Sequence, residues 1–145
     1  MRLWHYQLLP YLPDAQFKGQ LRELVAIMHD WRDKGKTNHL LINRVMEYPK
    51  GDLWNYLIRY HGEYGKRYGT TINTKTYAEF AEFADDYVEW GKPFKCWHNK
   101  EYLRACMSNL YEKHYFGIGK SRITDEEWKI LLNGYKVITG EDYRI

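Results

Sequence analysis

Several features that would assign this 145-residue chain to a common class are missing. No apolar run reaches membrane-span length, and the first residues lack the basic and apolar regions of a secretory signal. Only two cysteines occur, Cys96 and Cys106, so we expect free thiols in a reducing cytoplasm rather than a disulfide framework. Internal repeats, low-complexity runs and linkers rich in Pro, Gly or Ser are absent as well. We therefore expect one domain over residues 1–145.

Standard metal and nucleotide motifs are also missing. Two cysteines and two histidines occur near one another, but their spacing matches no zinc pattern: Cys96, His98, Cys106 and His114. The stretch from Gly117 to Arg122 is not a Walker A loop, because the earlier glycine of that motif would fall on His114. We predict neither a metal site nor a cofactor.

Basic residues are absent from one segment of a chain whose net charge is only +3. Residues 76–91 carry five acids and no base, whereas residues 1–72 carry 11 Lys and Arg against 7 Asp and Glu. Residues 92–122 carry seven bases and two acids. A fold that turned the acidic segment away would present a basic face to phosphates, and scattered solvated charge is the alternative.

Apolar residues recur at helical spacing along the whole chain, and no alternating strand pattern competes. Aromatic residues are abundant at 17%, which suits a packed core and also base stacking. The pattern predicts an all-α bundle of five or six helices. The expected helices run from Asp14 to Gly35, Asn38 to Tyr48, Asp52 through Ile58, Thr74 or Thr76 to Gly91, Asn99 through Leu110, and the capping box Thr124–Glu127 to Gly134.

The opening residues MRLWH are unusually apolar for a chain terminus, because termini are loose and polar unless something holds them. The first predicted helix carries a polar flank beside its apolar stripe, and Gly19 lies in that flank. A glycine in mid-helix costs ~1 kcal/mol relative to Ala and often marks the close approach of another backbone. We expect the N-terminal segment to pack there, and ordinary surface positions are the alternative. The flank consists of Gln16, Gly19, Gln20, Glu23 and Asp30.

A series of short motifs runs in order through the first 114 residues: Arg2-Leu3, Gln16, Arg22-Glu23, Asn38-His39, Asp52-Leu53, Lys66–Gly69, His98 and Leu110–Lys113. Together they resemble the pyrimidine-dimer DNA glycosylase family. The opening MRLWH and the stretch WHNKEYLRACMSNLYEKH are similar to bacterial relatives in that family. Residues 115–145 are a divergent C-terminal extension.

The resemblance implies an all-α fold with the N-terminal segment threaded between helices. It also implies a DNA glycosylase and AP lyase that acts on UV-damaged or abasic double-stranded DNA in base excision repair. The catalytic residues that it implies are the α-amine of Met1 and the carboxylate of Glu23. The predicted DNA-binding residues are Arg2, Gln16, Arg22, His39, His98, Lys113, Lys120 and Arg122. The last two belong to a glycine-rich turn, Gly117–Arg122.

The chain departs from the family at two positions. A phage enzyme of this family loses its initiator Met and begins with Thr, whereas Arg2 here is too bulky for ordinary Met removal, so we expect Met1 to stay. Met1 then stands at the position of the family's first residue, and one extra residue in the Pro10–Pro13 turn keeps Arg22-Glu23 aligned with the family's motif. The family's arginine one turn after the glutamate is replaced by Ala26, which weakens the expected DNA affinity and dimer specificity.

An α-amine suits nucleophilic attack on C1′ of the deoxyribose, which gives an imine, because the amine must be unprotonated to react. Its reference pKa is about 7.7–8.0, against about 10.4 for Lys, so it is partly neutral near pH 7. A carboxylate beside C1′ stabilises the cationic sugar that forms as the glycosidic bond breaks. A non-catalytic nucleic-acid-binding protein on the same scaffold is the alternative function, and a helical interaction protein is a third. We expect a monomer without membrane contact.

The turn Gly117–Arg122 resembles the hairpin of helix-hairpin-helix modules, in which glycine amides approach a phosphate. The next helix cap comes late, at Thr124, so an ordinary turn between helices is the alternative.

Overall fold

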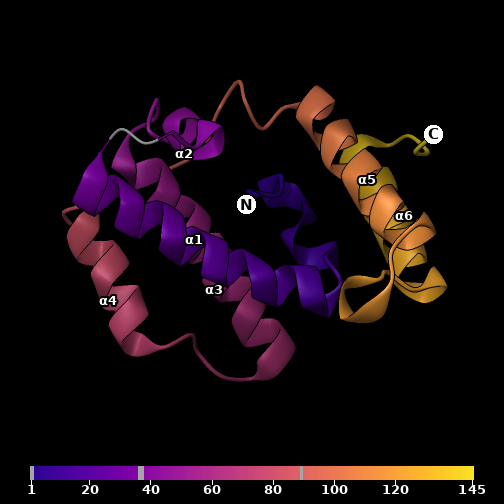
Figure 1. The fold of residues 1–145 in the computed structure, drawn as a ribbon, viewed down its shortest axis with the longest axis horizontal. Helices are drawn as coiled ribbons and strands as arrows, with labels where there is room; N and C mark the ends of the chain where they lie inside the picture. Colours follow the sequence, from indigo (N-terminus) through magenta and orange to yellow (C-terminus); the bar gives the residue numbers. More distant parts are fainter. Residues whose placement is uncertain (1, 36–37, 89) are drawn as a thin grey trace. The chain divides into compact units, whose positions relative to one another are not determined.

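The computed structural model describes residues 2–35, 38–88 and 90–145. These residues form helices and no strands, which confirms the predicted all-α class. None of the helices in the described ranges is long and apolar enough to cross a membrane. In chain order the elements are η1 (Tyr6–Tyr11), α1 (Asp14–Lys34), α2 (Leu40–Val45), α3 (Lys50–Tyr68), α4 (Thr74–Phe83), α5 (Lys100–Tyr115), η2 (Gly119–Ser121) and α6 (Asp125–Thr139), where η marks a 3-10 helix (Figure 1).

The chain divides into two compact units, which we call the first and the second unit. The first unit comprises residues 1–3 and 20–95, and so contains most of α1 together with α2, α3 and α4. Within it α3 packs against α4. Its core is built from side chains without exposed surface, among them Leu24, Ile27, Leu53, Tyr56, Tyr60 and Phe80.

The second unit comprises residues 4–19 and 96–145. Here α6 packs against both η1 and α5, and Figure 1 shows α5 and α6 side by side. Because the unit combines the start of the chain with its end, residues far apart in sequence share its core. Its fully buried side chains include Leu8, Phe17, Met107, Leu110, Leu131 and Tyr135. The prediction of a single domain over residues 1–145 stays a prediction.

The N-terminal segment is buried, as its apolar sequence predicts. Leu3 has no exposed surface, and the exposed fractions of Trp4 and His5 are 4% and 1%. The backbone of Arg2 is bound by side chains of α1, so the segment packs against the polar flank of that helix. The predicted threading of this segment into the fold is therefore confirmed.

Two predicted helix boundaries are wrong, one because of a contact distant in sequence and the other because of the local backbone conformation. Asp52 was expected to cap α3, but the helix begins at Lys50, and the buried Asp52 carboxylate accepts a hydrogen bond from the backbone N–H of Phe94 at 3.1 Å. The fourth helix was expected to reach Gly91, but α4 ends at Phe83. Its first residue is Thr74, one of the two expected, with Asn73 as its N-cap, and positive φ angles at Asp85 and Asp86 take the chain out of the helix.

Helix α6 contains a glycine that does not end the helix, contrary to the prediction from sequence. Gly134 was expected to end this helix, since glycine favours helix C-termini. The helix instead continues to Thr139 and is closed by Gly140 in the left-handed region. A Cβ atom at Gly134 would collide with the ring of Tyr11, so this glycine allows η1 to approach the helix closely. The predicted capping box at Thr124 and Glu127 is confirmed.

Candidate active site

The carboxylate of Glu23 binds the backbone next to the start of the chain. Its Oε2 atom accepts a hydrogen bond from the backbone N–H of Arg2, and the two atoms are 2.6 Å apart. Such short distances are typical of hydrogen bonds to a charged acceptor. Met1 lies outside the described residues, but its α-amine is three covalent bonds from the Arg2 nitrogen. The first unit thus brings Glu23 to the residue that follows the predicted nucleophile.

Gln20 binds the other side of the same residue. Its Nε2 atom donates to the carbonyl oxygen of Arg2 at 2.9 Å, and its Oε1 accepts from the hydroxyl of Tyr56 at 3.2 Å. Both Gln20 and Tyr56 are buried. Residues three apart on a helix lie on one face, so Gln20 and Glu23 together fix both backbone polar groups of Arg2. Tyr56, which lies on α3, in turn fixes the amide of Gln20.

Three further predicted residues belong to the first unit. Arg2 and Arg22 have exposed side chains, and Arg22 immediately precedes Glu23 on α1. His39 is exposed at the N-terminus of α2, where its side chain forms no capping hydrogen bond. Their exposure is compatible with phosphate contacts, and their DNA-binding roles stay predictions.

Four predicted residues come together around one turn of the second unit. The buried Gln16 donates from Nε2 to the carbonyl oxygen of Ser121 at 2.9 Å, which fixes it beside Lys120 and Arg122. The carbonyl of Lys113 accepts from the backbone N–H of Ile123 at 3.3 Å, so the end of α5 closes onto the same turn. The sequence placed these residues far apart, and the fold of the second unit gathers them.

His98 has a structural environment that the sequence analysis missed. It is buried, and its Nδ1 atom accepts a hydrogen bond from the backbone N–H of Tyr6 at 3.2 Å. Its carbonyl accepts from Nε2 of His5 at 3.0 Å, and its ring stacks with those of His5, Tyr6 and Tyr102. This favours packing over DNA contact. The apolar start of the chain was the signal that residues here are buried.

The stack also fixes the protonation state of His5. Burial lowers the pKa of His5 to about 4, against a partly opposing effect of its hydrogen bond to the carbonyl of His98. Nδ1 of His5 accepts from the backbone N–H of Gln7 at 3.1 Å, which requires that this nitrogen carry no proton. His5 is therefore neutral near pH 7 and donates from Nε2.

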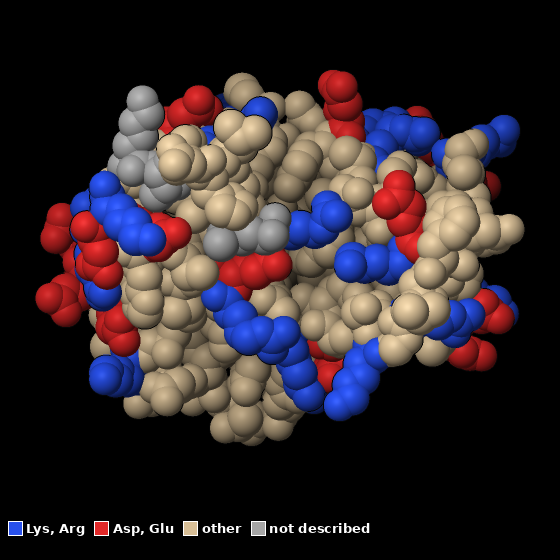
Figure 2. Space-filling view, in the orientation of Figure 1, with Lys and Arg blue, Asp and Glu red and all other residues tan. Residues whose placement is uncertain are grey.

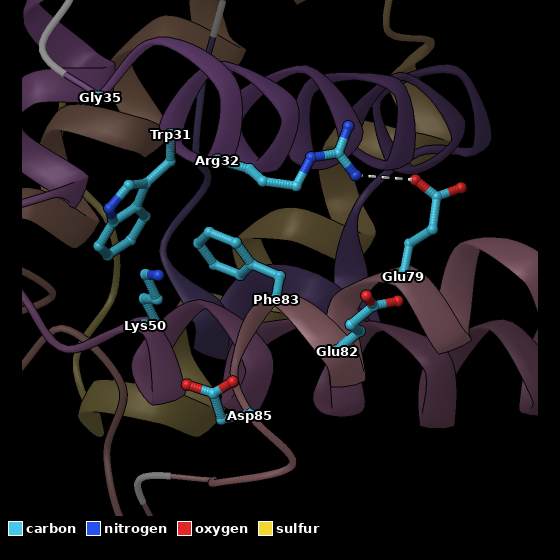
Figure 3. Close-up of a pocket in the computed structure, with 8 residues that line it drawn as sticks. All are labelled: Trp31, Arg32, Gly35, Lys50, Glu79, Glu82, Phe83 and Asp85. Atoms are coloured by element: carbon cyan, nitrogen blue, oxygen red, sulfur yellow. Dashed lines mark hydrogen bonds and ion pairs between the residues drawn. The ribbon is translucent and has the colours of Figure 1, made fainter.

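The first unit contains a cavity of about 450 Å³, and none of the predicted site residues is among its lining residues. Figure 3 shows Arg32 paired with Glu79 at one side, at 3.4 Å, and the rings of Trp31 and Phe83 at the other. Hydrogen bonds from His29 and Arg32 hold the pKa of Glu79 below its usual value. The acidic segment 76–91 was the only sequence signal for it. The lining residues are Trp31, Arg32, Gly35, Lys50, Glu79, Glu82, Phe83 and Asp85.

Acidic and basic groups are mixed at this edge of the first unit. Figure 2 shows Lys and Arg next to Asp and Glu over the ends of α1 and α4, at the left of the view. Arg32 pairs with both Asp33 and Glu79, and Lys34 pairs with Asp30. The acidic segment is thus partly neutralised by α1.

Neither cysteine forms a disulfide, and Cys96 is exposed while Cys106 is buried. Within the described ranges, no three His, Cys, Asp or Glu side chains are grouped so as to hold a metal ion.

Comparison with known proteins matches a family model to the part of the chain that carries Glu23. A family model described as pyrimidine dimer DNA glycosylase matches residues 1–76, which is just over half of the chain. Searches of curated proteins and of solved structures found no match. The matched range contains both partners of the hydrogen bond between Glu23 and Arg2, and the family name implies glycosylase action on DNA. The chain belongs to the pyrimidine dimer DNA glycosylase family.

Proposed function

We propose that this protein is a DNA glycosylase and AP lyase that acts on pyrimidine dimers or abasic sites through the α-amine of Met1. The observation that carries the proposal is the 2.6 Å hydrogen bond between Glu23 and the backbone N–H of Arg2. This bond joins Glu23, the only acid in the N-terminal half of the polar flank of α1, to Arg2, the residue after the proposed nucleophile. The proposal takes Met1 as the first residue of the active protein.

The reaction begins when the neutral amine attacks C1′ of the damaged nucleotide. The bond between C1′ and the base breaks, and the base leaves with the bonding electron pair. The attacking nitrogen then carries two protons and gives one of them up; its lone pair expels the ring oxygen O4′, which takes up a proton, and a protonated imine that keeps one N–H joins Met1 to C1′. Glu23 stabilises the positive charge that develops on the sugar and accepts protons during these steps.

Strand cleavage follows from the imine. The protonated imine acidifies C2′, so a proton leaves C2′ and the 3′ phosphate departs by β-elimination. Water then hydrolyses the imine and restores the free amine. On a DNA that already lacks the base, the same sequence begins with the aldehyde form of the sugar, so one pair of groups serves both activities.

The basic and polar surface residues hold the DNA in this proposal. Arg2, Arg22 and His39 act from the first unit, and the turn with Lys120 and Arg122 acts from the second. Exposed guanidinium and ammonium groups neutralise phosphates and release counterions, so binding weakens steeply as salt rises. Gln16 and Lys113 support the same turn through the bonds described above. His98 contributes by packing.

The substitution Glu23→Gln tests the function against its alternatives. Strand cleavage of abasic and UV-irradiated duplexes should fall at least ~100-fold, the scale for losing one transition-state electrostatic contact. DNA affinity should stay equal or rise, because a negative charge is removed. Glu47→Gln is the matched control, since Glu47 is an exposed acid elsewhere in the first unit.

Counting strand breaks before and after alkali separates the two activities, because alkali reveals base loss that the lyase step has not converted. Equal cleavage by the Glu23→Gln and wild-type proteins would contradict the proposal. A wild-type protein that binds DNA in a salt-dependent way but cuts neither substrate would instead be a non-catalytic binder. Binding that ignores salt would favour a helical interaction protein.

A further inference from the structure

The turn after α5 exposes an unusual amount of apolar surface. Tyr115, Phe116 and Ile118 have exposed fractions of 66%, 72% and 86%. Single exposed apolar side chains are ordinary on protein surfaces, but three within four residues form a patch that marks a contact site. We call residues 115–118 the apolar turn. It lies in the second unit and outside the range that the family model matches.

The backbone beside the apolar turn is tightly closed. A Cβ atom at Gly117 would collide with the carbonyl of Lys113 and lie 3.3 Å from Cα of Arg122, so only glycine fits there. The N–H of Arg122 donates to the carbonyl of Gly119 at 3.2 Å, and Gly119 has a φ of +73°. The exposed side chains therefore project from a constrained turn.

The far end of the turn is anchored in the core of the second unit. Ile123 has no exposed surface, and its carbonyl bonds to Nδ1 of His114 at 2.9 Å. Gln16 binds the carbonyl of Ser121 from α1. Because both ends are held, inserting the apolar side chains into a partner would cost little ordering entropy.

Basic side chains flank the apolar turn. Lys120 and Arg122 are exposed, and neither forms an ion pair within the part of the chain that the structure describes. Of the acids that follow, Asp125 lies 3.6 Å from Nε2 of His114, and Glu127 binds the backbone N–H of Thr124 in the capping box. Cations beside exposed apolar groups fit a polyanion with an apolar interior, which is the description of a DNA duplex.

We propose that Phe116 and Ile118 form a wedge that enters the base stack of duplex DNA, while Lys120 and Arg122 bind the adjacent phosphates. Proteins that kink or open a duplex insert apolar side chains between base steps, and an aromatic ring stacks on any base. The wedge deepens the proposed function, on whose DNA substrate it rests. It supplies the opening of the duplex that a glycosylase needs before its amine can reach C1′.

The test uses the full chain and a duplex that contains a tetrahydrofuran abasic analogue with 2-aminopurine beside it. The analogue lacks the hydroxyl at C1′, so it forms no imine, and the fluorescence of 2-aminopurine rises when the base is unstacked. Wild-type protein should raise the fluorescence on binding. The double variant Phe116→Ala, Ile118→Ala should lose that rise and bind ~10-fold more weakly, within the range of base-stacking losses.

Two controls make the result specific. Ile130→Ala with Val137→Ala removes apolar side chains of 53% and 64% exposure from α6 of the same unit, and should change neither signal. Lys120→Gln with Arg122→Gln should make the negative slope of log affinity against log salt shallower by ~2. The wedge variant should keep the wild-type slope, because its charges are unchanged. Circular dichroism confirms that each variant is folded.

A wedge variant with wild-type fluorescence rise and affinity would overturn the proposal. This outcome is separable from failure of the proposed chemistry, because the analogue reports on stacking without reaction. If the Glu23→Gln protein cuts DNA normally while the wedge variant loses the rise, the catalytic assignment fails and the wedge stands. If cleavage depends on Glu23 but stacking does not depend on the wedge, the reverse holds.

Discussion

The two units hold neighbouring parts of the N-terminal segment by different chemistry. In the first unit, the backbone of Arg2 is bound by a carboxylate and an amide, Glu23 and Gln20. In the second unit, His5 and Tyr6 are held by stacked rings and by hydrogen bonds to neutral partners, chiefly on His98. The charged acceptor Glu23 thus binds the residue that follows Met1.

Under the proposed function, the contacts of Arg2 belong to the reactive site and the histidine stack has a structural role. A neutral group would satisfy a backbone N–H as well. The use of Glu23 at that position is explained if the carboxylate has chemistry to perform. His5 carries no such charge near pH 7, because burial lowers its pKa. Changes in the stack should therefore affect stability, and changes around Arg2 should affect reaction as well.

The largest expected loss of stability comes from truncating a buried leucine, either Leu3 in the N-terminal segment or Leu8 in η1. Leu3 and Leu8 have no exposed surface and lie in the first and second unit. Leu3→Ala and Leu8→Ala should each lower the free energy of unfolding by about 3 kcal/mol, measured by urea titration. Only Leu3→Ala should also reduce cleavage of abasic DNA in buffer where both proteins are folded, since it loosens the residue bonded to Arg2. Equal cleavage by the two variants would erase the distinction between the units.

The next effect is a pH dependence that His5 of the second unit contributes. The unfolded chain protonates His5 near pH 6.5, whereas the folded chain does so near pH 4. Between these values the unfolded state binds more protons, so stability falls as pH is lowered, by at most about 3 kcal/mol. Urea titrations at pH 7 and pH 4.5 should show the loss, and His5→Gln should flatten this part of the pH profile. An unchanged profile in His5→Gln would assign the loss to other groups.

A smaller effect sharpens the role of the hydrogen bonds around Arg2. Gln20→Ala removes both the donor to the Arg2 carbonyl and the amide oxygen that accepts from the Tyr56 hydroxyl, at a cost of about 2 kcal/mol. Tyr56→Phe removes only the hydroxyl and should cost about 1 kcal/mol. Cleavage measured with saturating protein should fall more in Gln20→Ala than in Tyr56→Phe. The opposite order would mean that the orientation of Arg2 is not what limits the reaction.

Helical periodicity was enough to predict the class and the approximate position of each α-helix. The ends that depend on local hydrogen bonds, such as the capping box at Thr124, were also predictable. The ends that depend on distant partners were not. Asp52 serves the backbone of Phe94 instead of its own helix, and Gly134 makes room for Tyr11.

The candidate site divides in the same way. The link between Glu23 and the N-terminal segment followed from helix geometry and the apolar terminus, and the structure has it. The burial of His98 did not follow, because its partners Tyr6 and His5 lie over 90 positions away in the chain. The cavity at Arg32 and Glu79 likewise depends on the pairing of α1 with α4, which no local pattern encodes.

The most direct test of the central claim is borohydride trapping of the imine. Protein with its native N-terminus is mixed with an abasic duplex and with a UV-irradiated duplex, and the reduced adduct is mapped by mass spectrometry. The account predicts one covalent adduct on the α-amine of Met1 with both DNAs, and its loss in Glu23→Gln. An adduct on a lysine, or none in a protein that still binds DNA, would contradict it.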